Sequence, residues 1–428
     1  MSLMTKLKGN QKEYDLIVIG GGPSGMMMAG RAGEMGARVL ILEKNKGLGT
    51  KLQITGGGRC NLTNAEFDIQ KFLANFPQSK QFLFSPFSKF SSENTFTFFE
   101  KKRLPLVVEA RKRVFPESQK ANDVFKTLER YVRSGGGEIK TDSQVTKINK
   151  ENNKIVSVET KKGEKYFAHN FALATGGASA SWTGSTGDGF KWLNKLGHTV
   201  KEPTANLVPL TTNDRWVHKL SGITLSFMTI RFIQNGKTKL KKTGKILFTH
   251  FGVSGPLIIN SSFEVKELMK KGHVTASIDM FPDTEENLLD QRVLKLFEKN
   301  KNKVIKNILP EILPKKVAQE ILQLPDINLL EREVNSITKE ERKALVKKMK
   351  GLSFDISGTL GLEKSIIADG GIALEEVNFK NMTSKIYPNL YLLGDILNIN
   401  RPSGGFSLQL CWTTGWVAGS DVGEKLNN

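Results

Sequence analysis

YDLIVIGGGPSGMMMAGRAGEMGARVLILEK, residues 14–44, determines the fold of the N-terminal part of this chain. Its first six residues are mostly apolar and rich in β-branched side chains, which predicts a buried strand over 14–19. A glycine-rich turn follows at once, small residues then predict a helix, and VLIL predicts a second strand. This order of strand, turn, helix and strand is that of a parallel βαβ unit.

The turn between the first strand and the helix has the pattern GxGxxG. Glycines in this pattern permit a tight turn and let the backbone approach a pyrophosphate, while the helix N-terminus supplies amides and the positive end of its dipole. Glu43 ends the second strand, where a carboxylate accepts hydrogen bonds from both ribose hydroxyls of an adenosine and disfavours the 2'-phosphate of NADP. We therefore predict dinucleotide contacts at Gly20, Gly22, Pro23, Ser24, Gly25, Glu43 and Lys44.

A basic, glycine-rich loop, KLQITGGGRCNLTN, follows the second strand at residues 51–64. Consecutive glycines next to a threonine and an arginine form a backbone nest that holds a pyrophosphate or the edge of a flavin. A lone cysteine in such a loop is more often a packed or cofactor-lining thiol than a redox centre. The predicted cofactor contacts of this loop are Lys51, Thr55, Gly57, Gly58, Arg59 and Cys60.

Two later segments complete the predicted site. The strand FALATGG places Thr175, Gly176 and Gly177 next to a cofactor, with a flexible surface loop as the alternative for the Ser/Thr/Gly run that follows. Near the C-terminus, NLYLLGD predicts a buried strand ending at Asp395, a position suited to a ribityl hydroxyl. Gly404, Gly405 and Phe406 then open a helix whose positive end would face the N1 and C2 carbonyl of a flavin. Together these segments predict FAD as the cofactor.

The length and composition of the chain limit the class of protein to which it can belong. A chain of 428 residues predicts two or three domains. No apolar run is long enough for a transmembrane helix and no leader peptide precedes the first strand, which predicts a cytoplasmic location. The two cysteines cannot build a disulfide framework, and no metal-binding pattern occurs, so we expect no metal.

The net charge of +20 has two interpretations. Lysines are scattered through segments such as KTKLKKTGK, with acids interleaved along the chain and no aromatic stacking platform beside them. A solvated, lysine-rich surface is the preferred interpretation, and contact with RNA is the alternative.

Over nearly its whole length the chain resembles the BaiN/YhiN-type flavoproteins, which are NAD(P)/FAD-dependent oxidoreductases or aminoacetone oxidase-like FAD enzymes related to the fumarate reductase and glutathione reductase groups. The specific motifs are TGGGRCN and FTHFGVSGP, supported by RVFPESQKANDV, ATGGASASWTGSTGDG and GDILNINRPSGGFSLQ. The segment Arg401–Ser403 departs from the small, acidic-glycine approach that is usual in this family before the GGF turn.

The resemblance implies an α/β fold with a discontinuous, Rossmann-like FAD-binding domain of the glutathione reductase and fumarate reductase type, an inserted β-barrel-like domain and a small helical domain. In this chain these are residues 1–192 with 366–428, residues 193–283 with 351–365, and residues 284–350. The segment 284–350 is rich in charge and has helical periodicity, whereas 193–278 has short strands and an Asn-Gly turn. The resemblance also implies Val145 as a backbone contact to adenine.

The residues do not name the substrate. His250, Arg59 and Arg401 are candidate catalytic or substrate-binding residues, because they could bind an anion or move a proton. Cys60 is a candidate for a redox role. No second GxGxxG occurs, which indicates that a dedicated nicotinamide-binding domain is absent. NADH or NADPH would therefore bind only transiently when it reduces the flavin. The leading hypothesis is an FAD-dependent oxidoreductase that acts on a small molecule by hydride transfer through flavin N5. The alternatives are an RNA-associated flavoprotein similar to tRNA-modifying enzymes, and a flavin-bound protein without turnover.

Overall fold

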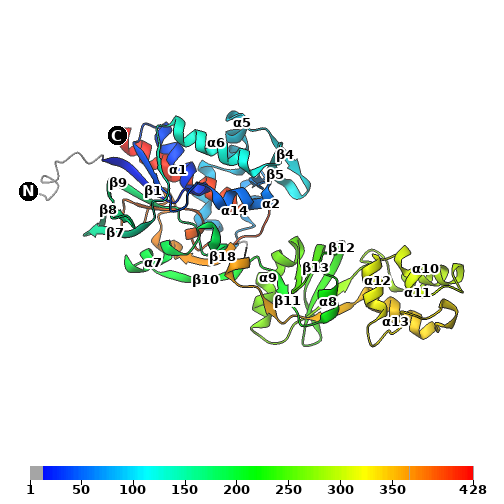
Figure 1. The fold of residues 1–428 in the computed structure, drawn as a ribbon. Helices are drawn as coiled ribbons and strands as arrows, with labels where there is room; N and C mark the ends of the chain where they lie inside the picture. Colours follow the sequence, from blue (N-terminus) through cyan, green and yellow to red (C-terminus); the bar gives the residue numbers. More distant parts are fainter. Residues whose placement is uncertain (1–12, 366, 428) are drawn as a thin grey trace, which may run out of the picture. The chain divides into compact units, whose positions relative to one another are not determined.

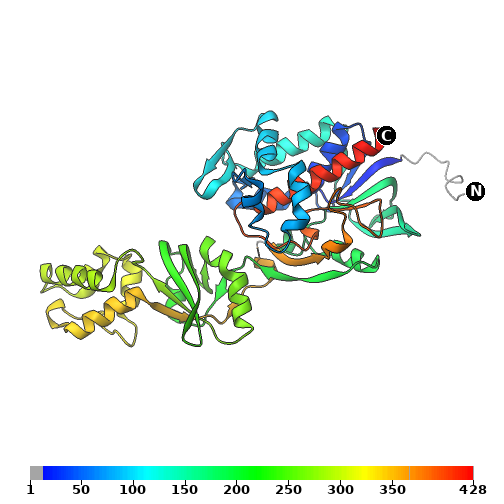
Figure 2. The same ribbon diagram turned by 180° about the vertical axis from the view of Figure 1, so that it is seen from behind.

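The computed structural model describes residues 13–365 and 367–427, which form two compact units (Figures 1 and 2). The first unit takes in the described residues up to 205 and from 367 onward, and the second runs from 206 to 365. The first unit is therefore assembled from both ends of the sequence.

A mixed seven-stranded sheet is the centre of the first unit. Strand β1 pairs in parallel with β2 and β9, and the C-terminal β19 pairs in parallel with β9. The antiparallel strands β8 and β7 extend the sheet beyond β9. In spatial order the strands are β6 (Glu138–Lys140), β2 (Val39–Leu42), β1 (Tyr14–Ile19), β9 (Lys165–Leu173), β8 (Lys154–Thr160) and β7 (Val145–Glu151), with β19 (Leu390–Leu392) beside β9.

Strand β1 is covered on both faces, which explains its nearly continuous apolar sequence. Leu16 and Val18 belong to one hydrophobic cluster, and Ile17 and Ile19 belong to another. The helices of the unit are α1 (Pro23–Glu34), α2 (Thr50–Gly58), α3 (Ile69–Leu73), α4 (Lys80–Lys89), α5 (Ser92–Lys101), α6 (Ala121–Ser134), α7 (Asp188–Lys195) and α14 (Phe406–Asn427). Ser91 caps α5 in a capping box with Asn94.

Helix α14 packs along α1, although the two are separated by most of the sequence (Figure 1). Three glycines spaced four residues apart, Gly415, Gly419 and Gly423, lie on the contact face. A Cβ on Gly415 would stand 2.5 Å from the Ser24 carbonyl oxygen, and one on Gly419 would stand 2.6 Å from the Met28 carbonyl oxygen. The glycines thus let the two helix backbones approach closely, so that the C-terminal helix supports the glycine turn before α1.

Two small sheets complete the first unit. One pairs β10 (Val200–Asn206) with β18 (Ile367–Ile372), and its β10 ends at the boundary between the units. The other holds β3 (Thr63–Asn64), β5 (Arg113–Pro116) and β4 (Leu106–Glu109) in that order.

The second unit is built on an antiparallel seven-stranded sheet. Its central hairpin joins β12 and β13 through the predicted Asn235-Gly236 turn, and both turn residues have positive φ. The strand order is β16 (Leu352–Asp355), β15 (Thr275–Asp279), β12 (Thr224–Gln234), β13 (Lys237–Thr249), β14 (Gly252–Ser254), β11 (Leu210–Thr211) and β17 (Gly358–Thr359).

One hydrophobic cluster joins the sheet of the second unit to its helices, and it includes Phe232 and Ile278 from strands and Val293 and Val346 from helices. The helices are α8 (Arg215–Lys219), α9 (Pro256–Met269), α10 (Glu286–Lys299), α11 (Ile305–Ile308), α12 (Lys315–Leu322) and α13 (Lys339–Lys350). Thr338 opens α13 with a capping box. The division of this unit into a β-barrel-like domain and a helical domain stays a prediction.

No helix in the described part of the chain combines the length and the apolar character that crossing a membrane requires.

Candidate functional site

The first unit holds a cavity with about 1180 Å³ of empty space, open to solvent. Its walls come from the end of β1 and the glycine turn, the segment from β2 into α2, the start of β7, the segment after β9, and the start of α14. The cavity therefore lies at the carboxyl ends of the parallel strands, where open α/β sheets bind ligands.

Three glycines of the turn before α1 have different structural roles. Gly20 has φ +106° and a Cβ there would stand 2.5 Å from the Ala174 carbonyl oxygen, so the turn requires glycine. A Cβ on Gly25 would stand 2.1 Å from the Gly20 carbonyl oxygen, so Gly25 serves close packing of helix on strand. Gly22 lines the cavity, and a Cβ on it would meet only the Ala174 carbonyl oxygen, at 3.9 Å. Protein packing leaves the space over Gly22 free, as the approach of a pyrophosphate requires.

Glu43 is oriented by two backbone amides. One carboxylate oxygen accepts a hydrogen bond from the Gly21 N–H at 2.8 Å, and the other accepts one from the Asn45 N–H at 2.8 Å. The residue is 7% exposed and lines the cavity. Each carboxylate oxygen retains a lone pair that can accept a ligand hydroxyl, which is the predicted role toward an adenosine ribose.

Lys44 and Asn45 hold the loop after β9 over the cavity. The Lys44 ammonium donates to the Thr186 hydroxyl at 2.6 Å and to the Asp188 carboxylate at 3.0 Å. The Asn45 side chain donates to the Thr183 carbonyl oxygen at 3.1 Å. The Ser/Thr/Gly run that could have been a surface loop therefore forms part of the cavity wall.

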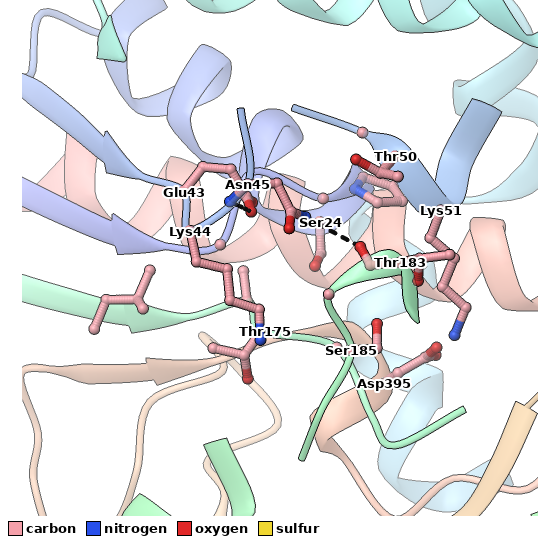
Figure 3. A pocket seen from close by; sticks show the side chains of 18 of the residues that line it. Ser24, Glu43, Lys44, Asn45, Thr50, Lys51, Thr175, Thr183, Ser185 and Asp395 are labelled. Atoms are coloured by element: carbon pink, nitrogen blue, oxygen red, sulfur yellow. Dashed lines mark hydrogen bonds between the residues drawn. The ribbon is translucent and has the colours of Figure 1, made fainter. Parts of the chain in front are cut away.

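Lys51 and Asp395 line the side of the cavity opposite to Glu43 (Figure 3), and Arg401 lies behind the wall next to Asp395. The Asp395 carboxylate accepts a hydrogen bond from Arg401, which is 3% exposed and also donates to the Ile399 carbonyl oxygen at 2.6 Å. The Lys51 ammonium donates to the Ser179 hydroxyl at 2.6 Å. The two cations outnumber the carboxylate, so this end of the cavity has an excess of positive charge.

The environment shifts the pKa values of this cluster. Burial alone would raise the pKa of Asp395, but the charges of Arg401 and Lys51 outweigh it and hold the pKa below its ordinary value. Burial lowers the pKa of Lys51, and the charge of Asp395 opposes this effect. Asp395 is therefore ionised at neutral pH, and it can accept a hydroxyl hydrogen bond while it neutralises Arg401.

The Thr175 hydroxyl is the buried side-chain oxygen that lacks a hydrogen-bond partner among the described residues. Thr175 is the second residue after β9, and it lines the cavity together with Gly176. A buried hydroxyl without a partner costs free energy, and a ligand with hydroxyl or phosphate oxygens would remove that cost.

The structure brings many predicted cofactor residues together and leaves others outside the cavity wall. Those that line the cavity are Gly20, Gly22, Pro23, Ser24, Glu43, Lys44, Lys51, Thr55, Val145, Thr175, Gly176 and Asp395. Those outside the wall are Gly25, Gly57, Gly58, Arg59, Cys60, Gly177, Gly404, Gly405 and Phe406.

Packing accounts for several of the residues outside the wall. A Cβ on Gly405 would stand 2.3 Å from the Thr63 backbone, so this glycine permits a close backbone crossing before α14. The Phe406 ring packs against Phe72, with 5.0 Å between the ring centroids. Gly57 and Gly58 have positive φ, and a Cβ added to either would meet no atom of the described residues within 4 Å. Their turn is exposed rather than folded over the cavity.

The two cysteines differ in position but share a buried setting. Cys60 belongs to a hydrophobic cluster and is 0% exposed, whereas Cys411 on α14 lines the cavity. Burial raises the pKa of each thiol to about 12. Both are therefore protonated at neutral pH, which does not favour the thiolate chemistry considered for Cys60.

The remaining catalytic candidates lie in different surroundings. Arg59 forms an ion pair with Glu109 at 2.9 Å and stacks over the Phe115 ring. Arg401 forms an ion pair with Asp395 and does not line the cavity. His250 belongs to the second unit, in the turn between β13 and β14, and its role stays a prediction.

The motifs do not predict several residues of the wall, including Asn45, Gln144, Ser407 and Cys411. Ser407 and Cys411 are four residues apart on the predicted helix, so its periodicity places them on the same face once the GGF turn is recognised. Gln144 precedes Val145 in a segment without a motif, and nothing in the sequence marks it.

The sheet, the glycine turn, the oriented carboxylate and the free space over Gly22 fit a bound dinucleotide, and the positive end of the cavity fits a flavin. These features define a Rossmann-type, FAD-dependent oxidoreductase of the fumarate reductase and glutathione reductase type. Within this class the chain belongs to the family described as the HI0933-like protein Rossmann domain, whose model matches residues 14–421.

Two curated relatives match along almost their whole length. One, from Escherichia coli (strain K12), is named "Ribosomal RNA dihydrouridine synthase"; it is 25% identical over 416 residues, which is 96% of this chain and 98% of the relative. The other, from Clostridium scindens, is named "3-dehydro-bile acid delta(4,6)-reductase"; it is 27% identical over 414 residues, which is 95% of this chain and 98% of the relative.

Solved structures share the fold at low sequence identity. A flavocytochrome c3 fumarate reductase in an open conformation has a TM-score of 0.56 and 14% identity, covering 98% of this chain and 80% of that chain. A 3-ketosteroid-Δ4-(5α)-dehydrogenase from Rhodococcus jostii RHA1 has a TM-score of 0.56 and 13% identity, covering 98% of both chains.

Proposed function

We propose that this protein is an FAD-dependent reductase that adds two hydrogens across a carbon–carbon double bond conjugated to a carbonyl group, and that its substrate is a uridine in RNA. The observation that carries the reductase proposal is the cavity itself, with an oriented carboxylate at one end and an excess of positive charge at the other. The positive end suits the negative charge that a flavin gains on reduction.

Different residues of the cavity wall would contact different parts of the cofactor. Glu43 and Val145 would hold the adenosine half, and the Gly22 turn would take the pyrophosphate at the N-terminus of α1. Asp395 and Lys51 would contact the flavin half. When bound, FAD would supply a hydride at N5, which it receives from NADH or NADPH, and a proton from solvent would supply the second hydrogen. Lys51 would hold a positive charge beside the ring, while Asp395 keeps Arg401 compensated.

The names of the relatives support the substrate class. Dihydrouridine is uridine with two more hydrogens on a double bond conjugated to a ring carbonyl, and the bile acid reductase also acts on unsaturation near a ketone. Both names therefore describe the same type of reduction. The net charge of +20, which a solvated lysine-rich surface also explains, is compatible with an RNA substrate.

A direct test supplies the flavin-loaded protein with NADH or NADPH under anaerobic conditions and then adds ribosomal RNA that lacks dihydrouridine. The expected result is oxidation of the reduced flavin by the RNA, and dihydrouridine in the nuclease digest by mass spectrometry. Flavin that RNA does not reoxidise, together with RNA of unchanged mass, would contradict the RNA substrate.

A second candidate substrate is a small conjugated ketone, of the kind that the name of the bile acid reductase describes. The same reduced protein would then be reoxidised by a steroid-like dienone faster than by RNA. Failure of both acceptors, with normal reduction by the nicotinamide, would leave the flavin chemistry intact and remove the double-bond reductase.

A further inference from the structure

Strand β13, which forms a hairpin with β12 in the second unit, has one side in the core and the other side exposed to solvent. Ile246 and Phe248 of β13 belong to the hydrophobic cluster. Residues that alternate with them, among them Lys241 and Lys245, point to the other side of the sheet. Lys239, at a bulge of the same strand, is exposed as well. We call Lys239, Lys241 and Lys245 the basic face.

The charge of the basic face is not neutralised within the fold. Among the residues that the structure describes, no carboxylate forms an ion pair with any of its three lysines. Lys242, which alternates onto the opposite side of the strand, does have a carboxylate, Glu264, at 3.6 Å. An acid on a neighbouring strand, Asp279, is already paired with Arg231 at 3.1 Å and with Lys350 at 2.9 Å. The positive charge of the basic face is thus available to a partner.

An exposed aromatic ring lies across from Lys245, at one end of the basic face, contrary to the expectation that no aromatic platform would be found beside the lysines. Ser226 and Phe227 form a β-bulge in β12 opposite Lys245. Phe227 is 76% exposed and has φ +62°, a conformation that side chains with a Cβ rarely adopt. The fold leaves both the exposure and the backbone conformation without a packing role, and such outliers occur at binding sites.

We propose that the basic face binds the phosphate backbone of single-stranded RNA and that Phe227 stacks on an unpaired base. Lysines two residues apart on a strand stand about 7 Å from each other, so several can follow one nucleic acid strand. A phenylalanine beside a basic track is the arrangement that binds single strands without strong sequence preference. The inference rests on the RNA substrate proposed above, and it adds the surface that would hold this substrate.

The test measures the binding of a fluorescein-labelled oligouridylate to the flavin-loaded protein across a salt series. The variant with Lys239, Lys241 and Lys245 changed to glutamine should lower the slope of log affinity against log salt by about 2, since each phosphate contact to a single strand contributes about 0.7. The control changes Lys161 and Lys162, exposed lysines of the first unit, to glutamine and should keep the slope. Equal slopes in all three proteins would overturn the proposal.

Phe227 is tested separately. Phe227→Ala should weaken oligouridylate binding roughly fivefold or more, while Phe227→Trp should retain it, because stacking needs only an aromatic ring. Leu288→Ala, at another exposed apolar residue of the second unit, is the control and should have no effect. Loss of affinity in Leu288→Ala as large as in Phe227→Ala would overturn the stacking role.

Two further measurements distinguish RNA binding from lipid binding and from damage to the flavin site. Vesicles with anionic lipid should bind less tightly than the oligouridylate, and tighter binding to vesicles would overturn the choice of RNA. Reduction of the flavin by NADH or NADPH should be the same in every variant, because all changes lie outside the cavity. RNA binding that depends on the basic face, without any uridine reduction, would contradict the proposed function and leave this inference standing.

Discussion

The two ends of the cavity are built in different ways. The Glu43 end uses backbone amides, glycines and one carboxylate from a continuous stretch of about thirty residues, to which β7 adds Val145. The Asp395 end brings together Lys51, Asp395 and Arg401, which come from opposite ends of the chain. The first end is fixed by the conformation of a single turn, whereas the second depends on the packing of α14 against α1 and on charge compensation. Changes at the first should therefore act through sterics, and changes at the second through electrostatics.

The largest effect is expected from Gly20→Val, which tests the steric character of the first end. The new Cβ would stand 2.5 Å from the Ala174 carbonyl oxygen in a backbone with φ +106°. We expect the free energy of unfolding to fall by about 4 kcal/mol or more, measured by denaturant titration. Gly57→Ala, at φ +70° with open space around it, should cost only about 1–2 kcal/mol. Equal costs would contradict the steric origin of the effect.

Asp395→Asn tests the electrostatic character of the second end. It would leave Arg401 buried beside Lys51 without a compensating charge, which should cost about 3–5 kcal/mol of unfolding free energy at neutral pH. The pKa of Asp395 is lowered by folding, so its stabilisation is present above the ordinary value of 3.8 and is lost as the pH falls through the folded pKa. The difference between wild type and variant should therefore shrink in acid. A difference that grows in acid would contradict this sign.

Gly22→Ala separates cofactor binding from folding. The residue has φ −79°, and its Cβ would meet only one protein atom, at 3.9 Å, so the FAD-free protein should keep its stability. The methyl group would enter the space of the pyrophosphate and weaken FAD binding by about 1–3 kcal/mol, or roughly 5- to 150-fold. Titration of the FAD-free protein with FAD measures this change. Unchanged affinity would mean that the cofactor does not approach Gly22.

Lys51→Met should have the smallest effect and changes the flavin rather than the fold. Loss of a positive charge beside the ring disfavours the reduced, negatively charged flavin, so the two-electron midpoint potential should fall by about 30 mV for each 1.4 kcal/mol of interaction lost. Spectroelectrochemical titration measures the potential, with Lys161→Met as the matched control. A potential that rises, or that falls equally in the control, would place the flavin away from Lys51.

Sequence patterns suffice for the first end of the cavity and are insufficient for the second. Gly20, Gly22 and Glu43 can be placed because a turn between a strand and a helix has a fixed geometry, and their spacing reports it directly. Asp395 and Lys51 can each be identified, but their proximity and the partnership with Arg401 depend on long-range packing that no local pattern encodes. Phe406 lies at the start of the predicted helix, yet its side chain fills an aromatic cluster instead of the cavity wall.

The second unit shows the same contrast between local and long-range features. Its Asn-Gly hairpin and the Thr338 cap of α13 can be predicted because turns and caps are local, whereas the acidic residue before α10 forms no side-chain cap. The exposed ring of Phe227 cannot be predicted, since it arises from a one-residue bulge in the pairing of β12 with β13. The lysines of the basic face look dispersed in the sequence. They lie on one face of the sheet because of how β13 pairs with β12, and the sequence alone does not show this pairing.

Binding of FAD to the purified protein is the most direct test of the cavity as a cofactor site. We predict that the protein carries FAD, or takes it up stoichiometrically after its removal, and that Gly22→Ala weakens this binding while Gly57→Ala does not. Protein that contains no flavin, and gains no flavin absorbance when FAD is added, would contradict the assignment.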